Sequence, residues 1–246
     1  MSAVRDHTRP PGREPPPDFR AALDPMWAGT DPRFRVFHAR LALLRVLCRG
    51  SRSRILDVSC GGGDDLLALS PLVAFGVGVD VSAPRVQRAR LAALDLHLDN
   101  LRFAVGDAVA FHMDGSLPDT FDLILVRGCL GGETRALRVL RAARRRLARG
   151  GRIVVIEPHA HHPAVLWQRF CTGGRLGLPD PTGMTPGCVR RLARAEGLEP
   201  IAFELLPWVP EEEDIARLAM RGAWVRAMAR FPLTAHANFA MVLRAA

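Results

Sequence analysis

The residues best suited to chemistry stand in the segment Asp57-Val58-Ser59-Cys60-Gly61-Gly62-Gly63, which follows an apolar stretch and precedes a helical pattern. Small residues in such a turn let a ligand approach the backbone closely. The helix that follows would offer unpaired N–H groups to an anion such as a carboxylate. A nucleotide-like ligand is therefore indicated. The dinucleotide-binding fingerprint G-x-G-x-x-G does not fit, because Leu66 stands where its third glycine would be.

The elements that must hold this turn alternate between strand and helix along the chain. Short apolar runs predict strands at 55–59, 75–81, 101–105, 121–126, 152–157, 199–206 and 238–244. Helical spacing predicts helices at 31–49, 64–69, 82–96, 133–149, 185–197 and 211–230, with Ser82 as an N-cap and a left-handed C-cap at Gly150-Gly151. This order predicts an α/β fold with a doubly wound, mostly parallel sheet of seven strands. Such sheets bind ligands at the carboxyl ends of their strands, where the glycine turn lies.

The composition limits the class of protein. A chain of 246 residues can bury one large core, so residues 18–246 are expected to form one domain behind a disordered, proline-rich tail at 1–17. The sequence shows neither a secretory h-region nor an apolar run of membrane-spanning length, which favours a cytoplasmic protein without membrane association. The five cysteines form no C-x-x-C pair, which argues against both a disulfide framework and a structural zinc site. The net charge of +9 comes entirely from arginines, and it keeps a nucleic-acid partner open without favouring one.

Residues 53–157 resemble the class I S-adenosylmethionine-dependent methyltransferases, whose Rossmann-like fold has this order of elements. Asp57, Ser59, Gly61 and Gly63 stand on the marked positions of the family's motif I, D/E-x-G-x-G-x-G, with Ser59 replacing the first glycine. The second strand ends in Gly78-Val79-Asp80-Val81-Ser82, and the third leads to Val105-Gly106-Asp107-Ala108, which is similar to the family's G-D-A element. Residues 117–125 and 147–155 resemble the approach to the fourth strand and the turn into the fifth. Each motif alone is weak, but their order makes the set specific.

The resemblance implies S-adenosylmethionine as the cofactor, held by the glycine turn. Asp80 with Val81 would bind the two ribose hydroxyls, and Asp107 with Ala108 would meet the adenine ring. Arg127, after the fourth strand, could reach the cofactor or an acidic acceptor, or could be an ordinary edge charge. The aspartates also have simpler explanations as turn formers or helix-cap partners.

A general base for the methyl acceptor is expected after the fourth or fifth strand, near the methyl group. The fifth strand runs into Glu157-Pro158-His159-Ala160-His161-His162. His159 and His162 are the candidate catalytic residues, because the pKa of histidine suits a general base. The alternative is that these histidines are solvated loop residues. A metal site is not expected here, because Glu157 is the only nearby carboxylate and no cysteine stands beside the cluster.

Three segments lie outside the motif-bearing core at 53–157. The helix at 31–49 is expected to form a lid, and it is expected to build the acceptor pocket together with the segments 159–183 and 211–230. Aromatic residues in or near these segments could wall an apolar pocket or simply pack the added helices: Trp27, Trp167, Phe170, Trp208 and Trp224.

The sequence thus predicts a methyltransferase that modifies an O, N or C nucleophile of a small molecule, for example a secondary metabolite. An RNA methyltransferase is the second hypothesis, which the positive charge favours. Against it, the chain has no room for an appended RNA-binding module, and Val126-Arg127-Gly128-Cys129 stands where amino-directed nucleic-acid enzymes carry N-P-P-Y. The third hypothesis is a protein that binds the cofactor without transferring its methyl group. The sequence leaves the oligomeric state undetermined.

Overall fold

The structure is a computed structural model that describes residues 40, 41, 43–45, 47, 48, 53–110, 118–162, 165, 166, 184–206 and 238–246. Several sequence predictions fall outside these residues: the tail at 1–17, most of the helix at 31–49, most of the segment 159–183, the helix at 211–230, and the five aromatic residues named with them. Among the helices that can be described, none has the length and apolar character needed to cross a bilayer.

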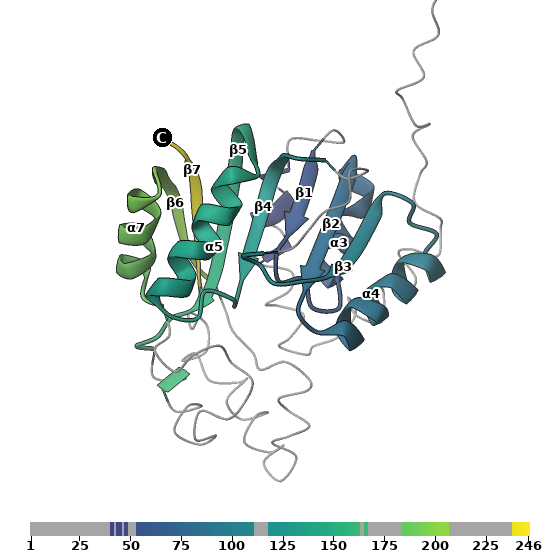
Figure 1. Cartoon of the computed structure of the whole chain (residues 1–246), viewed down its shortest axis with the longest axis horizontal. Coiled ribbons are helices and arrows are strands. Elements are labelled where there is room, and N and C mark those ends of the chain that lie inside the picture. The colour runs from purple at the N-terminus through teal and green to yellow at the C-terminus, as the bar shows by residue number, and fades with distance from the viewer. Residues whose placement is uncertain are drawn as a thin grey trace, which may run out of the picture.

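A seven-stranded sheet forms the centre of the molecule, as the sequence predicts (Figure 1). Its strands are β1 (Arg54–Asp57), β2 (Phe75–Asp80), β3 (Leu101–Val105), β4 (Phe121–Arg127), β5 (Leu147–Pro158), β6 (Leu198–Leu206) and β7 (Asn238–Ala245). They lie in the order β3-β2-β1-β4-β5-β7-β6, and the antiparallel β7 separates β6 from the five parallel strands. The chain changes direction across the sheet between β1 and β4. This switch point is where a doubly wound sheet opens a crevice for a ligand.

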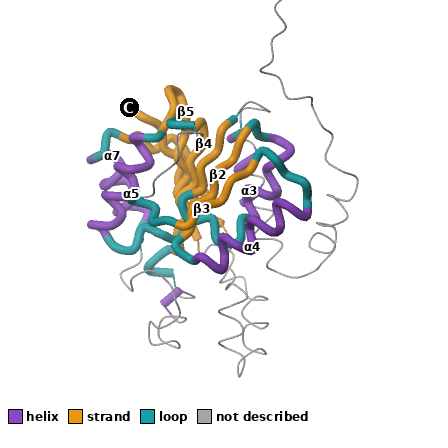
Figure 2. Tube along the Cα trace, turned by 45° about the vertical axis from the view of Figure 1, so that its right-hand side comes forward, coloured by secondary structure: helices purple, strands orange, loops and turns teal. Residues whose placement is uncertain are grey.

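Helices cover both faces of the sheet (Figure 2). The structure describes α3 (Asp64–Leu69), the 3-10 turn η1 (Ser70–Leu72), α4 (Ala83–Asp95), α5 (Glu133–Arg145) and α7 (Pro186–Ala195). On one face α5 and α7 pack over a core that includes Ile153 and Val155, and on the other α3 and α4 pack over a core that includes Val154 and Ile156. The strand β5, which lies between β4 and β7, is therefore buried on both sides, as its continuous apolar run predicts.

The helix expected over 133–149 is shorter than predicted. Helix α5 ends at Arg145, and Leu147 already belongs to β5, where it pairs with Phe121 of β4. The Phe121 N–H donates to the Arg146 carbonyl at 2.8 Å, so pairing with the sheet ends the helix. Gly150 has the expected positive φ of 74°, but it lies within β5 and does not cap the helix. The arginine-rich run has good helix propensity, and no local signal marks the earlier end.

The strand predicted at 152–157 begins earlier, at Leu147, for the same reason. The remaining boundaries that the structure describes agree with the predicted ones to within two residues, and the bounds of α3 and β3 are those predicted. Ser82 occupies the N-cap position of α4, but its side chain makes no capping hydrogen bond. The Asp80 carboxylate accepts the Ser82 N–H instead, at 2.9 Å. The hydrogen bond at the start of α4 is therefore made by the side chain of Asp80, two residues before Ser82.

Close packing against the Phe103 ring fixes the glycine turn relative to the sheet. A Cβ atom added to Gly78 of β2 would lie 2.6 Å from the Phe103 ring and 2.9 Å from Cys60 Sγ. A Cβ atom added to Gly63 would lie 2.8 Å from the same ring, and Gly63 also has a positive φ of 84°. Both glycines are therefore required by packing, and Gly63 also by its backbone conformation.

Gly78→Ala is expected to lower the free energy of unfolding by about 1–3 kcal/mol, because the added methyl group overpacks a buried site. Gly187→Ala is the matched control. Gly187 lies in the first turn of α7, and the nearest atom to its added Cβ would be 3.9 Å away. That variant should be unchanged or more stable by up to about 1 kcal/mol. Urea denaturation followed by circular dichroism measures both, and equal stability of the two variants would contradict the packing argument.

Candidate functional site

The three aspartates predicted from the sequence lie at the carboxyl ends of three neighbouring strands. Asp57 ends β1, Asp80 ends β2, and Asp107 follows β3. Each accepts, through Oδ1, the backbone N–H of the residue two positions later, at 3.2, 2.9 and 2.8 Å respectively. All three aspartates therefore form local turns, which is the simpler explanation that the sequence offered for them. Each turn uses only Oδ1, and the three Oδ2 atoms have different surroundings.

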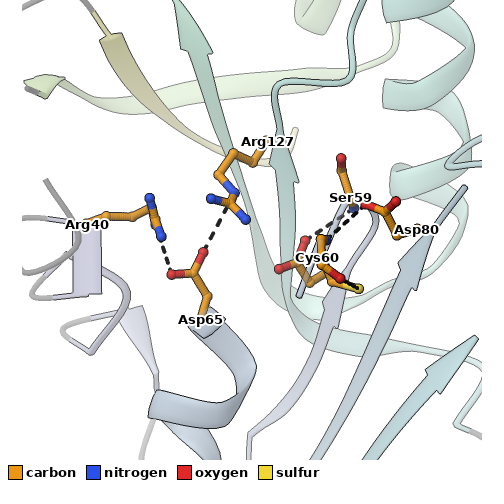
Figure 3. A network of polar contacts seen from close by, with 8 residues as sticks. Arg40, Ser59, Cys60, Asp65, Asp80 and Arg127 are labelled. Carbon is orange, nitrogen blue, oxygen red and sulfur yellow. Dashed lines mark hydrogen bonds and ion pairs between the residues drawn. The ribbon is translucent and has the colours of Figure 1, made fainter. Parts of the chain in front are cut away.

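The Asp80 carboxylate joins two strand ends. Its Oδ2 accepts the Gly61 N–H at 2.9 Å, so the glycine turn after β1 is held against the end of β2 (Figure 3). The residue is only 6% exposed. A carboxylate offers about four acceptor positions, so the two backbone bonds leave capacity for two hydroxyl donors. Val81, the next residue, is exposed.

The Asp57 carboxyl group is buried with an unsatisfied oxygen. Asp57 is 1% exposed, and among the described residues its Oδ2 is the buried side-chain oxygen that lacks a hydrogen-bond partner. Burial raises the pKa of Asp57 to about 7, with Arg127 opposing the shift and Asp65 adding to it. Buried acceptors are normally satisfied, and perturbed carboxyl groups of this kind gather at binding sites. A ligand with an ammonium or amide donor would complete this residue.

Space for such a ligand exists at the turn. Gly61 has a positive φ of 56°, and a Cβ atom added there would meet nothing within 4 Å. Cys60 is buried, and burial above all raises its thiol pKa far beyond the usual range. Helix α3 begins with Asp64 and Asp65, and no side chain caps its N-terminus at Gly63. The turn therefore has open space at Gly61, and the unsatisfied oxygen of Asp57 in the same segment suits a cationic or hydrogen-bond-donating group.

Asp107 is the most open of the three carboxylates. Its side chain is 38% exposed, and its Oδ2 forms an ion pair with Arg135 at 3.0 Å. Burial works to raise the pKa of Asp107, but the Val109 N–H and Arg135 outweigh it and hold the pKa below its usual value. Ala108 beside it is buried. An exposed acceptor next to a buried small residue is compatible with the predicted contact to a flat heterocycle.

Arg127 lies in a charge network that the sequence did not reveal. The Asp65 carboxylate accepts Arg40 Nε at 2.8 Å through Oδ1, and Arg127 Nε lies 3.8 Å from its Oδ2 (Figure 3). Asp65 is 2% exposed; burial works to raise its pKa, but Arg40 and then Arg127 outweigh it and lower the pKa. Leu41 and Leu44 beside Arg40 are buried in the same core as α3. The network therefore ties the N-terminal segment to both β4 and the glycine turn.

The candidate histidines follow β5, two strands away from β1 in the sheet. The His159 ring lies edge-on to Phe239 with 6.2 Å between centroids, and its Nδ1 accepts the His161 N–H at 3.3 Å. The His162 backbone N–H donates to the His159 carbonyl at 2.9 Å. With Nδ1 as the acceptor, the neutral His159 ring carries its proton on Nε2. In this arrangement His159 offers a donor rather than a free base.

Glu157 begins the segment expected from the sequence to supply a base, with no role of its own assigned to it. It is 4% exposed, and its Oε1 accepts the N–H groups of Cys129 and Leu130 at 2.9 and 3.1 Å. Burial raises the pKa of Glu157 to about 7, although these N–H groups favour its charged form. An acidic residue at the end of a strand buried on both faces is the signal that could have identified it.

The raised pKa of Asp57 predicts a pH-dependent stability. Between its ordinary value of 3.8 and its native value of about 7, the native state holds a proton that the unfolded state has released. Stability contributed by this proton is therefore lost as the pH rises through this window. Asp57→Asn copies the neutral form, so at pH 8 it should be more stable than the wild type, and the difference should be much smaller near pH 4, close to the ordinary pKa of the carboxyl group.

Urea unfolding at both pH values measures this difference. Asp95→Asn, an exposed position at the end of α4, serves as the control and should follow the wild type. A stability difference between Asp57→Asn and the wild type that is the same at the two pH values would show that Asp57 does not carry the proton.

Comparisons with known proteins identify the family of the chain. A family model described as a methyltransferase domain matches residues 50–176. The uncharacterized methyltransferase YcgJ of Bacillus subtilis is 32% identical over 122 residues, which are 48% of this chain and 46% of YcgJ. The ubiquinone biosynthesis O-methyltransferase of Albidiferax ferrireducens is 27% identical over 129 residues, 51% of this chain and 50% of that enzyme. The chain thus matches about half the length of these curated relatives.

Solved structures share the fold. The crystal structure of YcgJ has a TM-score of 0.58 at 23% identity, covering 84% of this chain and 97% of that one. The [4+2]-cyclase SpnF has a TM-score of 0.63 at 21% identity, covering 93% of each chain. With the family model spanning more than half of its residues, the chain belongs to the methyltransferase domain family and has the fold of the class I S-adenosylmethionine-dependent methyltransferases.

Proposed function

We propose that the chain binds S-adenosylmethionine and transfers its methyl group to an O, N or C nucleophile of a small molecule. The observation that carries this proposal is the row of carboxylates at the ends of β1, β2 and β3, around a glycine turn with open space at Gly61. The buried, unsatisfied Oδ2 of Asp57 is the part of this row that most clearly awaits a ligand.

The residues fit the cofactor group by group. Asp80, with two acceptor positions left, would take the ribose hydroxyls beside Val81. Asp107 and Ala108 would meet the adenine ring, with Arg135 holding the Asp107 carboxylate in place. These assignments place the adenosine over the ends of β2 and β3 and leave the methionine end for the switch point.

At the switch point the glycine turn would receive the methionine part of the cofactor. Gly61 leaves room for it between Ser59 and Gly63, and Asp57 Oδ2 is suited to its ammonium group. Arg127 would act on the cofactor indirectly, because Asp65 holds its guanidinium group. The structural comparison with SpnF supports this placement only at the level of the fold.

The reaction asks for positioning more than for covalent catalysis. The bound sulfonium supplies an activated methyl group, which an in-line nucleophile can displace. Holding the nucleophile, methyl carbon and sulfur in line can lower the activation free energy by about 7–11 kcal/mol. His162 remains the candidate base for an acceptor that must lose a proton, and His159 would orient the acceptor by donating from Nε2.

A small-molecule acceptor is favoured over RNA by the state of the surface arginines. On α5, Arg141 is paired with Glu196 at 2.8 Å, and on α7, Arg191 is paired with Glu133. Part of the basic surface is thus neutralised within the chain, whereas nucleic-acid binding needs cations available to phosphates. The likeness to an enzyme named as a ubiquinone biosynthesis O-methyltransferase also supports a small organic acceptor.

Asp80→Asn is expected to weaken binding of S-adenosylmethionine and of its demethylated product by at least about tenfold, because the ribose hydroxyls lose a charge-assisted acceptor. Isothermal titration calorimetry measures both ligands. Asn keeps the size of the side chain and an oxygen acceptor for one of the two backbone N–H groups, and circular dichroism checks that the variant is folded. The exposed Asp95→Asn variant should bind like the wild type.

If the wild type binds neither ligand, the proposal fails. If it binds both, incubation with S-adenosylmethionine and pools of small metabolites or RNA should give a gain of one methyl group, detected by mass spectrometry, in the small-molecule pool. A gain confined to RNA would move the assignment to an RNA methyltransferase. Binding without any methyl transfer would favour a protein that uses the cofactor in another way.

A further inference from the structure

The loop between β4 and α5 is built around the carboxyl group of Glu157. Gly128 lies directly after β4, and its N–H donates to the Ile156 carbonyl at 3.0 Å. The next two N–H groups, those of Cys129 and Leu130, both donate to Glu157 Oε1 at 2.9 and 3.1 Å. Successive backbone N–H groups that converge on one anion form a concave nest, and here the anion belongs to the protein itself.

The sequence of this loop makes its shape dependent on that carboxylate. Gly128, Gly131 and Gly132 all have positive φ values, of 59°, 48° and 87°. Three glycines in five residues give the backbone little conformational preference of its own. Cys129 and Leu130 between them are buried in the core under α5. Without an acceptor at Glu157, two buried N–H groups would be left unpaired, and the loop would have to rearrange.

The loop lies where the methionine end of the cofactor is expected. β4 is the direct neighbour of β1, and the Val58 N–H donates to the Leu125 carbonyl of β4 at 3.1 Å. With the adenosine placed over β2 and β3, the other end of the ligand must reach past Asp57 toward β4. Residues 127–130 therefore lie next to the glycine turn, on the side opposite to the proposed ribose position. Glu157 lies at the end of β5, the next strand in the sheet after β4.

We propose that Glu157 is a positioning residue for methyl transfer, which holds the loop 127–130 in the conformation that contacts the sulfonium and its methyl group. This inference rests on the proposed function. The residue acts through the backbone of the loop, whose N–H groups it accepts. Contacts of this loop with the sulfonium and its methyl group are absent once the methyl group has been transferred, so their loss weakens binding of the methylated ligand more than that of the demethylated one.

The test compares the affinities of S-adenosylmethionine and S-adenosylhomocysteine, because these two ligands differ only in the methyl group and its charge. In Glu157→Ala the affinity for S-adenosylmethionine should fall by about tenfold more than that for S-adenosylhomocysteine, as expected for the loss of one charge-assisted interaction. Glu157→Gln keeps the acceptor oxygen and loses the charge, so the ratio should fall less. Titration calorimetry on the full chain measures both ligands.

Glu204→Gln, the same substitution at an exposed position of β6, is the matched control and should keep the wild-type ratio. Hydrogen exchange of the full chain gives a second readout: peptides containing residues 129 and 130 should exchange faster in Glu157→Ala, with Glu157→Gln intermediate. If Glu157→Ala does not fold, the ratio in Glu157→Gln decides.

Two results would overturn the inference while leaving the proposed function in place: both ligands losing affinity equally in the Glu157 variants, or no change in either. Equal loss would make Glu157 a structural residue only. Failure of the wild type to bind either ligand would instead defeat the proposed function itself. The two failures are therefore distinguishable in one set of titrations.

Discussion

One carboxylate, that of Asp80, connects the parts of the site to one another. It accepts the Gly61 N–H from the turn after β1 and the Ser82 N–H at the start of α4, both at 2.9 Å. Through these two bonds the ends of β1 and β2 share a single charged group that is nearly buried. Because hydrogen bonds to a charged acceptor are the stronger ones, this contact fixes the glycine turn more firmly than the turn's own sequence could. The close packing of Gly63 and Gly78 against the Phe103 ring also fixes the position of the turn.

The charges at the switch point divide into a satisfied part and an unsatisfied part. Asp65 is satisfied by Arg40 and Arg127, and it joins the N-terminal segment to the sheet. Asp57, in the same cluster, keeps a free oxygen and a pKa near 7. Burial of an unpaired carboxyl group destabilises a fold, and such groups persist where a ligand completes them. Asp65 therefore stabilises this edge of the sheet through its ion pairs, whereas Asp57 is the residue that we propose as a ligand contact.

The sequence predicted those features that depend on local chemistry. The strand–glycine turn–helix at 55–69 and the aspartates after three strands follow from residue types and spacing, and the order of elements predicted the sheet. The end of α5 was missed, because only the pairing of Leu147 with Phe121 distinguishes a strand from more helix. The Arg40–Asp65 bond joins residues 25 positions apart, and Glu157 is 28 positions from the Cys129 N–H. Contacts of this kind appear only when β4, β5 and the N-terminal segment are brought together.

The central claim is that the ends of β1 and β2 form the cofactor site. A crystal structure of the full chain with S-adenosylhomocysteine tests it most directly. The account predicts the ribose hydroxyls on the Asp80 carboxylate, the adenine beside Asp107 and the ligand's amino group at Asp57 Oδ2. Density for the ligand at another place in the fold, with Asp80 and Asp57 untouched, would contradict it.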